Sequence, residues 1–295
     1  MKKNNHKCWV CSSLDTKKIR DSSIKNTLDS KDFKITNKDY GKTLSLFKCN
    51  NCGFLFSPYV SDLENYYREM EDNDYELTLE SRKIQSEKIL SQLEVRNIFK
   101  NKTLLDVGSG SGALMQASQK FGLISKGIEP SKSLQKLAVK KNLDVILGTL
   151  PSKRLNEKFD FVTLIDVIEH VNDPESLLKE INTVLKLNGK LFLVTPDVNS
   201  FFSKFLKFKW WHFRVAHVGY FNQKTLNILI EKCGYEIIKY QRPNWYFPIS
   251  YILNRILSYI SPKIEIKLPK SVDITIPLNL FDSYLVECKK INENN

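Results

Sequence analysis

Short apolar runs alternate with helix-like stretches over residues 103–195, and no other feature of the chain constrains its fold as strongly. The apolar runs occupy residues 103–107, 124–128, 144–147, 159–165 and 190–195. Continuous apolar runs are typical of parallel strands buried on both faces, and parallel neighbours need a crossover connection, usually a helix. The alternation therefore predicts an α/β fold with a doubly wound, mostly parallel sheet.

Local signals predict where two further elements lie. Asp173 and Pro174 offer an N-cap followed by proline at the first helical position, and we expect Gly189 to close that helix. Residues 283–288 read as a last strand, which we expect to form an antiparallel edge of the sheet.

The length of 295 residues predicts about two domains, and a composition of 42% hydrophobic and 26% charged residues excludes a wholly disordered or collagen-like chain. The most apolar stretch, 245–260, is interrupted by Pro248, Asn254 and Arg255, so we expect no transmembrane segment. The basic first residues are followed by no apolar run, unlike a signal peptide. We therefore expect a cytoplasmic protein whose cysteines stay reduced.

The formal charge of +12 favours anionic partners, although a lysine-rich composition also reflects genome bias. The charges are unevenly distributed along the chain: residues 62–80 are acidic, whereas residues 201–224 contain basic residues and no acidic one. The basic residues in the latter segment are Lys204, Lys207, Lys209, Arg214 and Lys224. A small anionic or sugar-like ligand is the partner this pattern favours, and we expect no stable nucleic-acid complex.

Four of the six cysteines form two C-x-x-C pairs. The pairs are Cys8 with Cys11 and Cys49 with Cys52, and Gly53 follows the second pair. Two thiolates at this spacing bind one ion when the chain forms a tight knuckle, and four sulfurs complete a tetrahedron with no open position. The spacing favours a structural zinc ribbon over residues 1–60; buried core thiols and a redox dithiol are the alternatives.

A glycine loop follows the first apolar run, at Gly108-Ser109-Gly110, two residues after Asp106. Glycines let the backbone pass close to a ligand, and the exposed N–H groups of the following helix favour an anionic group. Glu129 lies about twenty residues further on, where an acid binds a ribose. On these residues alone, a dinucleotide fingerprint is an equal interpretation.

The order of four segments resembles the class I S-adenosylmethionine-dependent methyltransferases, and the resemblance covers roughly residues 100–290. The matching segments are LDVGSGSG at 105–112, GIEPS at 127–131, FDFVTLIDVIEHV at 159–171 and LNGKLFLVTP at 187–196. The resemblance implies a Rossmann-like seven-stranded sheet. Together with the cysteine pairs, the chain is similar to zinc-ribbon methyltransferases of polysaccharide and natural-product pathways.

The resemblance also implies which residues bind the cofactor. Glu129 is expected to hold both ribose hydroxyls, and the loop is expected to pass against the amino-acid portion of S-adenosylmethionine. Leu150 is expected to flank the adenine and Asp166 to contact the methionine portion. The cofactor residues are thus Asp106, Gly108, Ser109, Gly110, Glu129, Leu150 and Asp166. Asp106 and Asp166 also have a plain interpretation as capping residues.

Two histidines are candidates for the chemistry of transfer. The segment Asp166-Val-Ile-Glu169-His170 resembles the quinone O-methyltransferases, in which these side chains bind a divalent cation, and many relatives keep Glu-His as plain structure. His217 lies in a loop rich in aromatic and basic residues, where the family builds its substrate wall. We expect His217, or His170, to act as a base for a hydroxyl; an aromatic lid that packs on the sheet is the alternative.

The expected organisation is a zinc ribbon at 1–60, a helical connector at 61–100 that covers the cofactor, and a methyltransferase domain at 101–290. The last includes a substrate lid at about 197–222 and an amphipathic helical insertion at about 245–270. In that insertion Ile249, Ile252, Leu253, Ile256 and Ile260 form a stripe at helical spacing. Core packing is the expected role of the stripe, and contact with a membrane surface or acceptance of a lipid tail are the alternatives.

The leading functional hypothesis is O-methylation of a sugar or nucleotide-sugar hydroxyl. C-methylation of a deoxysugar is an alternative, because the same motifs serve both reactions. An RNA methyltransferase that binds RNA through the ribbon is a further alternative, although residues 12–48 contain few aromatic residues. The last alternative is a non-catalytic interaction protein that contains a zinc ribbon.

Overall fold

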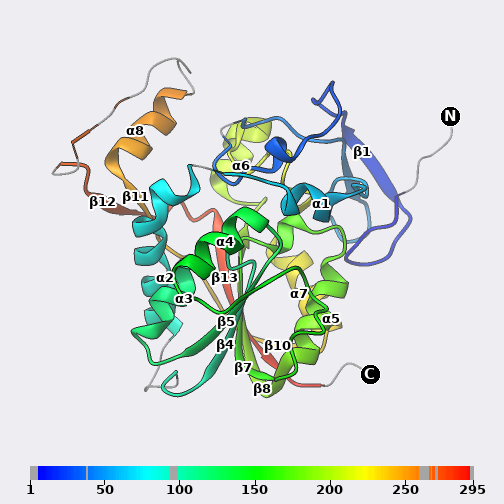
Figure 1. Cartoon of the computed structure of the whole chain (residues 1–295). Coiled ribbons are helices and arrows are strands. Elements are labelled where there is room, and N and C mark those ends of the chain that lie inside the picture. Colours follow the sequence, from blue (N-terminus) through cyan, green and yellow to red (C-terminus); the bar gives the residue numbers. More distant parts are fainter. Residues whose placement is uncertain are drawn as a thin grey trace.

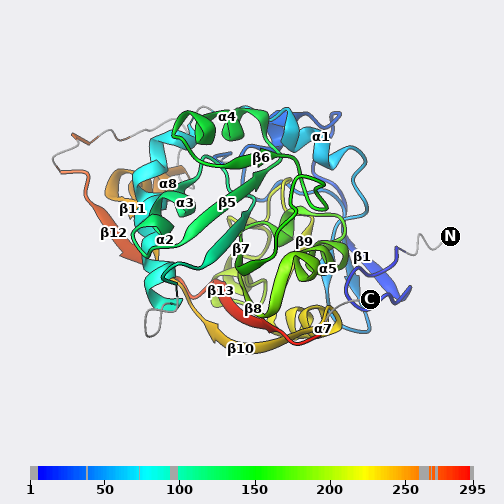
Figure 2. The same ribbon diagram turned by 60° about the horizontal axis from the view of Figure 1, so that its bottom comes forward.

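The computed structural model describes residues 6–292 apart from 38, 73, 94–98, 259–265, 267, 270 and 271. Its centre is a seven-stranded sheet in the order β10-β13-β8-β7-β4-β5-β6, which Figure 2 shows from β6 to β10. The five strands from β8 to β6 run parallel, and β13 pairs antiparallel with both β8 and β10. This confirms the predicted α/β fold. The bounds are β4 Thr103–Val107, β5 Ile124–Glu129, β6 Val145–Leu147, β7 Phe159–Ile165, β8 Leu185–Pro196, β10 Tyr235–Gln241 and β13 Ser283–Lys290.

Helices cover both faces of this sheet (Figure 1). Successive residues of a strand point to opposite faces, and here both sets are apolar and pack against helices. Leu104 packs in a cluster with residues of α2 and α3, whereas Leu105 packs with residues of α5 and α7 on the other face. Phe192 and Leu193 of β8 alternate in the same way. The helices are α2 Leu79–Leu93, α3 Ala113–Gln119, α4 Lys132–Lys140, α5 Pro174–Val184 and α7 Gln223–Lys232.

Two local predictions about this sheet are wrong. β13 is antiparallel as expected, but it lies inside the sheet, because β10 pairs with its outer side and forms the edge. Gly189 does not close a helix: α5 ends at Val184, and Gly189 lies within β8. Asn188 has a φ of 63°, and a Cβ at Gly189 would lie 2.8 Å from the carbonyl oxygen of Lys186, so a bend of the strand requires this glycine.

The N-terminal region forms a separate sheet in the order β1-β2-β3-β9. Its last strand comes from the segment expected to be a lid, since Leu55 pairs with Tyr220 and Phe56 with Gly219. The lid and the ribbon therefore share one sheet, which lies beside the central sheet in Figure 1. The bounds are β1 Thr16–Arg20, β2 Leu46–Cys49, β3 Leu55–Phe56 and β9 Gly219–Tyr220, with a 3-10 turn η1 at Ser30–Phe33.

Residues 61–93 connect the two sheets through α1 (Leu63–Arg68), a 3-10 turn η2 (Tyr75–Thr78) and α2. The sequence predicts a helix here with Ile84, Leu90, Leu93 and Ile98 roughly on one face, and Leu90 and Leu93 of α2 are buried. Ile98, predicted on the same face, lies outside the described residues. Two more short turns and one short helix lie near the carboxyl edge of the sheet: η3 Ile168–His170, α6 Phe201–Leu206 and η4 Lys207–Lys209.

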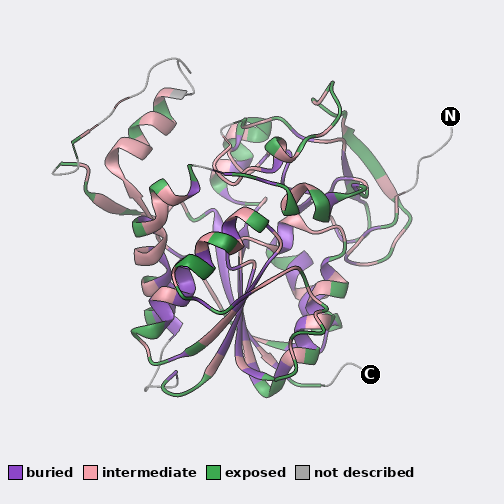
Figure 3. Ribbon diagram, in the orientation of Figure 1, coloured by how far each residue is buried: buried purple, intermediate pink, exposed green. Residues whose placement is uncertain are grey.

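An arm projects beside α2, formed by β11 (Trp245–Pro248), α8 (Ile249–Ser258) and β12 (Thr275–Leu278). The expectation that its apolar stripe packs in the core is wrong, because none of residues 249–257 is buried, as the absence of purple on α8 in Figure 3 shows. Ile260, the last member of the stripe, lies outside the described residues. Among the described residues, no helix has the length and apolar content to cross a membrane.

Candidate active site

The glycine loop lies between β4 and α3, at the carboxyl edge of the parallel strands, where ligands of doubly wound sheets bind. Gly108 and Gly110 have φ values of 75° and 56°, which favour glycine. A Cβ at Gly108 would lie 2.5 Å from Cγ2 of Val167, and one at Gly110 would lie 2.3 Å from the Tyr75 hydroxyl. The connector therefore covers the loop with Tyr75, over whose ring the Arg82 guanidinium lies at 4.0 Å.

Glu129 ends β5, and one of its carboxylate oxygens bonds this loop. The backbone N–H groups of Gly110 and Ser131 each donate to one oxygen, both at 2.8 Å. Burial raises the pKa of Glu129 to about 7 despite these bonds. Each oxygen keeps a second lone pair, so the carboxylate can still accept one bond from each of two ribose hydroxyls.

Asp106, by contrast, lies beneath the loop on β4. Its carboxylate accepts a hydrogen bond of 2.7 Å from the Thr163 hydroxyl, and burial raises its pKa to about 7. Ser109 is buried in the loop itself, and Leu150 is half-buried after β6, where it packs against the core. The structure thus places Asp106, Ser109 and Glu129 together and Leu150 at the neighbouring strand end.

Two carboxylates near the loop have an oxygen that is buried without a partner among the described residues. They are Asp166, at Oδ1, and Glu169, at Oε1. Asp166 follows β7 with a φ of 52°, and burial raises its pKa to about 6. Buried oxygens without partners are rare in native structures, and a ligand that donates hydrogen bonds is one way to satisfy them. The residues present therefore fit a polar ligand such as S-adenosylmethionine.

Glu169 and His170 of η3 meet His217 from the lid. One ligand atom from each lies within 4.8 Å of the others, and the rings of His170 and His217 are perpendicular at 4.6 Å. The Thr195 hydroxyl donates to Oε2 of Glu169 at 3.0 Å. The structure brings both predicted histidines and the predicted glutamate into one cluster, a donor set of two imidazoles and a carboxylate that can hold a divalent cation.

Burial dominates the protonation of this cluster. It lowers the pKa of His170 to about 3 and that of His217 well below its ordinary value, and it raises the pKa of Glu169 well above the usual range. Both imidazoles are therefore neutral at pH 7, with a nitrogen lone pair for a proton or an ion.

Three further groups lie at this site that the sequence did not assign to it, although Tyr66, Tyr67 and Tyr75 resemble the connector tyrosines that cover the cofactor in related enzymes. Tyr67 of α1 contacts Nδ1 of His170 at 2.6 Å, and Tyr75 covers Gly110. His212 lies 3.6 Å from Asp282, whose Oδ2 also accepts a hydrogen bond of 3.3 Å from the Trp210 indole. The tyrosines of the acidic connector were a signal for the first two, but their spacing did not select which of them reach the site. Asp282 carries no sequence signal.

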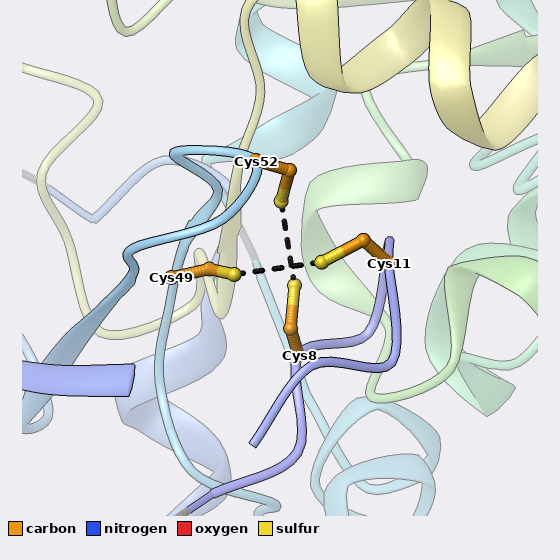
Figure 4. A group of neighbouring side chains, drawn as sticks. All are labelled: Cys8, Cys11, Cys49 and Cys52. Carbon is orange, nitrogen blue, oxygen red and sulfur yellow. Dashed lines mark hydrogen bonds between the residues drawn. The ribbon is translucent and has the colours of Figure 1, made fainter. Parts of the chain in front are cut away.

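The four cysteines of the two C-x-x-C pairs point toward a common centre (Figure 4). Sγ of Cys8 lies 3.6 Å from Sγ of Cys52, and Sγ of Cys11 lies 3.5 Å from Sγ of Cys49. Sulfurs at zinc–sulfur bonds of about 2.3 Å in a tetrahedron lie roughly 3.8 Å apart. The cluster therefore fits a zinc ion, whereas the separations are too long for disulfides.

Both cysteine pairs have the same backbone turn. The N–H of Ser12 donates to the carbonyl of Cys8 at 3.0 Å, and the N–H of Gly53 donates to that of Cys49 at 3.0 Å. Both residues after the pairs are left-handed, with φ of 62° at Ser12 and 84° at Gly53. These are the two knuckles expected from the spacing.

Backbone hydrogen bonds join the ribbon to the histidine cluster. The N–H of Ser57 donates to the carbonyl of Val218 at 2.8 Å, and the N–H of Val218 donates to the carbonyl of Glu169 at 2.8 Å. Val218 thus bridges the ribbon and η3 directly beside His217. The segment after the second cysteine pair fixes where His217 lies.

The fold and the glycine loop with Glu129 fit the class of methyltransferase domains. The family model described as a methyltransferase domain matches residues 80–240, more than half of the chain, and the chain belongs to that family. The match confirms the family inferred from the four segments.

Curated relatives match a shorter part. The ubiquinone biosynthesis O-methyltransferase of Coxiella burnetii is 31% identical over 125 residues, covering 37% of this chain and 50% of that protein. Its namesake from Haemophilus ducreyi is 36% identical over 116 residues, covering 35% of this chain and 49% of that protein. The chain spans about half the length of the curated relatives it matches.

A solved structure agrees at the level of the fold. A chain from the complex between the Haloferax volcanii Trm112 methyltransferase activator and a methyltransferase has a TM-score of 0.53 at 15% identity. The likeness covers 75% of this chain and 95% of that chain.

Proposed function

We propose that the protein transfers the methyl group of S-adenosylmethionine to a hydroxyl of a small molecule. One observation supports this proposal above all: the glycine loop, Glu129 and a neutral histidine cluster lie together at one edge of the sheet. The family of the chain supports the donor, and the names of the curated relatives support an O-methylated small molecule.

In this mechanism each residue has a separate task. S-adenosylmethionine supplies an electrophilic methyl group on a sulfonium. Glu129 would bind the ribose hydroxyls, and the loop at Gly108 and Gly110 would let the backbone approach the amino-acid portion. His217 or His170 would accept the proton of the acceptor hydroxyl, because both imidazoles lie at this sheet edge. Tyr67 holds His170 in place.

We propose a sugar or nucleotide-sugar as the acceptor. Trp211 and His212 are half-exposed in the lid and offer an aromatic wall with a polar edge. Arg214 is not available for a phosphate, because its guanidinium donates to the carbonyl oxygens of Lys34 and Ile35. A phenolic quinone precursor is the second acceptor class, favoured by the position of Glu169 and His170 within the family match and by the names of the relatives.

We also propose a structural zinc ion at the four cysteines and the division into ribbon, connector and methyltransferase domain. Four thiolate ligands leave no open coordination position, so this ion would have no part in methyl transfer. A divalent cation at Glu169, His170 and His217 is a separate proposal that the donor set permits.

Calorimetric titration of S-adenosylmethionine and, in parallel, NADH tests the donor. Binding of the first alone supports the proposal, and binding of NADH would contradict it. Transfer of a labelled methyl group to nucleotide-sugars, to catechols and to RNA then tests the acceptor. Transfer to catechols alone would replace the sugar by a phenol, and transfer to RNA alone would restore the RNA methyltransferase hypothesis. A carbon-bound label would indicate C-methylation.

A further inference from the structure

The short helix α6 exposes two phenylalanines to solvent. Phe201 is 72% exposed and Phe205 is 71% exposed, and their rings stack at 5.9 Å because they lie one turn apart. The opposite side of α6 already packs on the lid through Phe202 and Leu206. The outward phenylalanines therefore contribute nothing to the core.

Lysines surround these rings. Lys204 lies between the two phenylalanines in sequence, and Lys207 and Lys209 follow in η4; all three are exposed. Phe208, 37% exposed, lies among them. No acidic residue occurs from 201 to 224. Aromatic rings interleaved with lysines are typical of a surface that lies in the interfacial region of an anionic membrane.

The arm is joined to the segment that carries this surface. The Arg255 guanidinium of α8 lies 4.2 Å from the centre of the Tyr40 ring, and the next residue, Gly41, donates its N–H to the carbonyl of Phe213 at 2.7 Å. This chain of contacts joins α8 to the lid, and Figure 1 shows α6 and α8 at the same end of the molecule. On α8 Leu253 is 37% exposed and Ile256 is 56% exposed.

We propose that α6, η4 and the exposed side of α8 form a docking surface for an anionic membrane. The phenylalanines enter the boundary between headgroups and acyl chains, and the lysines contact the headgroup phosphates. A second copy of the chain fits less well, because a two-fold contact would place the lysines of α6 and η4 against the same lysines of the partner. The inference does not depend on which acceptor is methylated.

Sedimentation of the full chain with phosphatidylcholine vesicles, with and without about a third of phosphatidylglycerol, tests this surface. We expect binding to the anionic vesicles, weakened by salt. The double changes Phe201→Ser with Phe205→Ser, and Lys204→Glu with Lys207→Glu, should each lower the partition coefficient roughly tenfold or more. Val139→Ser with Lys140→Glu on α4 changes another exposed apolar residue, which is 49% exposed, together with an exposed lysine, and should leave binding unchanged.

Three results would overturn the proposal. One is the absence of binding by the unchanged chain, and another is equal binding by the α6 variants and the α4 control. The third comes from the native mass: a dimer that the phenylalanine changes convert to monomer would show that a second copy covers this face. Thermal unfolding of every variant checks that the fold is retained, which the exposure of the changed side chains favours.

Discussion

The hydroxyl of Tyr67 lies 2.6 Å from Nδ1 of His170, and both groups lie within hydrogen-bond distance of the carbonyl oxygen of Ala216, at 3.1 Å and 2.9 Å. Since the tyrosine donates its single proton to that carbonyl, the ring proton of His170 belongs on Nδ1. Nε2 then keeps its lone pair. A connector helix thus fixes which nitrogen of His170 is available for a proton or an ion.

Replacing Tyr67→Phe should therefore lower kcat more than it changes cofactor binding. Loss of one hydrogen bond to a buried ring costs about 1–2 kcal/mol, which corresponds to a roughly tenfold slower transfer. The measurement is kcat together with the Kd of S-adenosylmethionine. Tyr66→Phe is the matched control, because the Tyr66 ring stacks on Phe33 at 4.9 Å and should need no hydroxyl. Equal effects of the two changes would exclude the positioning role.

Binding of S-adenosylmethionine should strengthen as the pH rises from 6 to 8. Burial raises the pKa of Glu129 to about 7, and only the ionised carboxylate accepts a bond at both oxygens. The ionised fraction rises about tenfold across this interval, so Kd should fall by up to that factor. The pH dependence is measured by calorimetry. Glu129→Gln should bind weakly at every pH, while Asp106→Asn removes the neighbouring acid and should keep the slope.

The contact of Gly110 with Tyr75 gives a test of the loop. Gly110→Ala puts a methyl group where the Tyr75 hydroxyl lies and leaves alanine at a φ of 56°. We expect roughly a tenfold loss of cofactor affinity, since the left-handed conformation costs an alanine about 1–2 kcal/mol and the added methyl group displaces Tyr75 from the loop. In a Tyr75→Ala background the same change should cost less. An equal loss in both backgrounds would show that backbone strain, not the tyrosine, sets the effect.

The sequence predicted the elements whose pattern is local. β4 and β7 begin and end where the apolar runs do, and the glycine loop lies where Gly108 and Gly110 place it. Parallel strands that are buried on both faces consist of unbroken apolar runs, so the sequence alone indicates where they begin and end. The cysteine spacing likewise predicted a cluster of four sulfurs, because a knuckle depends only on neighbouring residues.

Long-range pairing was beyond the same reasoning. Nothing in Gly219 or Tyr220 shows that these residues complete the sheet of the ribbon, nor that β10 covers the outer side of β13. The prediction that the stripe of α8 packs in the core was wrong for a related reason. An apolar stripe has the same helical period whether it faces a core or the exterior. Pairing partners and burial depend on the whole fold, and so the contact of Tyr67 with His170 was not foreseen.

The four cysteines should bind one zinc ion per chain, and its loss should disturb the histidine cluster. Cys49→Ser or Cys52→Ser should lower the zinc content measured by plasma mass spectrometry from about one per chain to near zero, because a three-thiolate site binds far more weakly. Cys288→Ala, which removes a buried thiol far from the cluster in sequence, should retain the ion. Retained zinc in the first two variants would contradict the site.

Because β3 pairs with β9, loss of the zinc ion should also affect the lid. Without the ion the second knuckle loses its anchor, and the bond from Ser57 to Val218 should open more often. Hydrogen exchange of residues 215–221 should then accelerate in Cys49→Ser, while exchange in β4 and β7 stays slow. Since His217 lies in this segment, kcat should fall with the zinc content although the ion touches no reacting atom. Unchanged exchange in 215–221 would show that the ribbon and the lid are held together by their side chains alone.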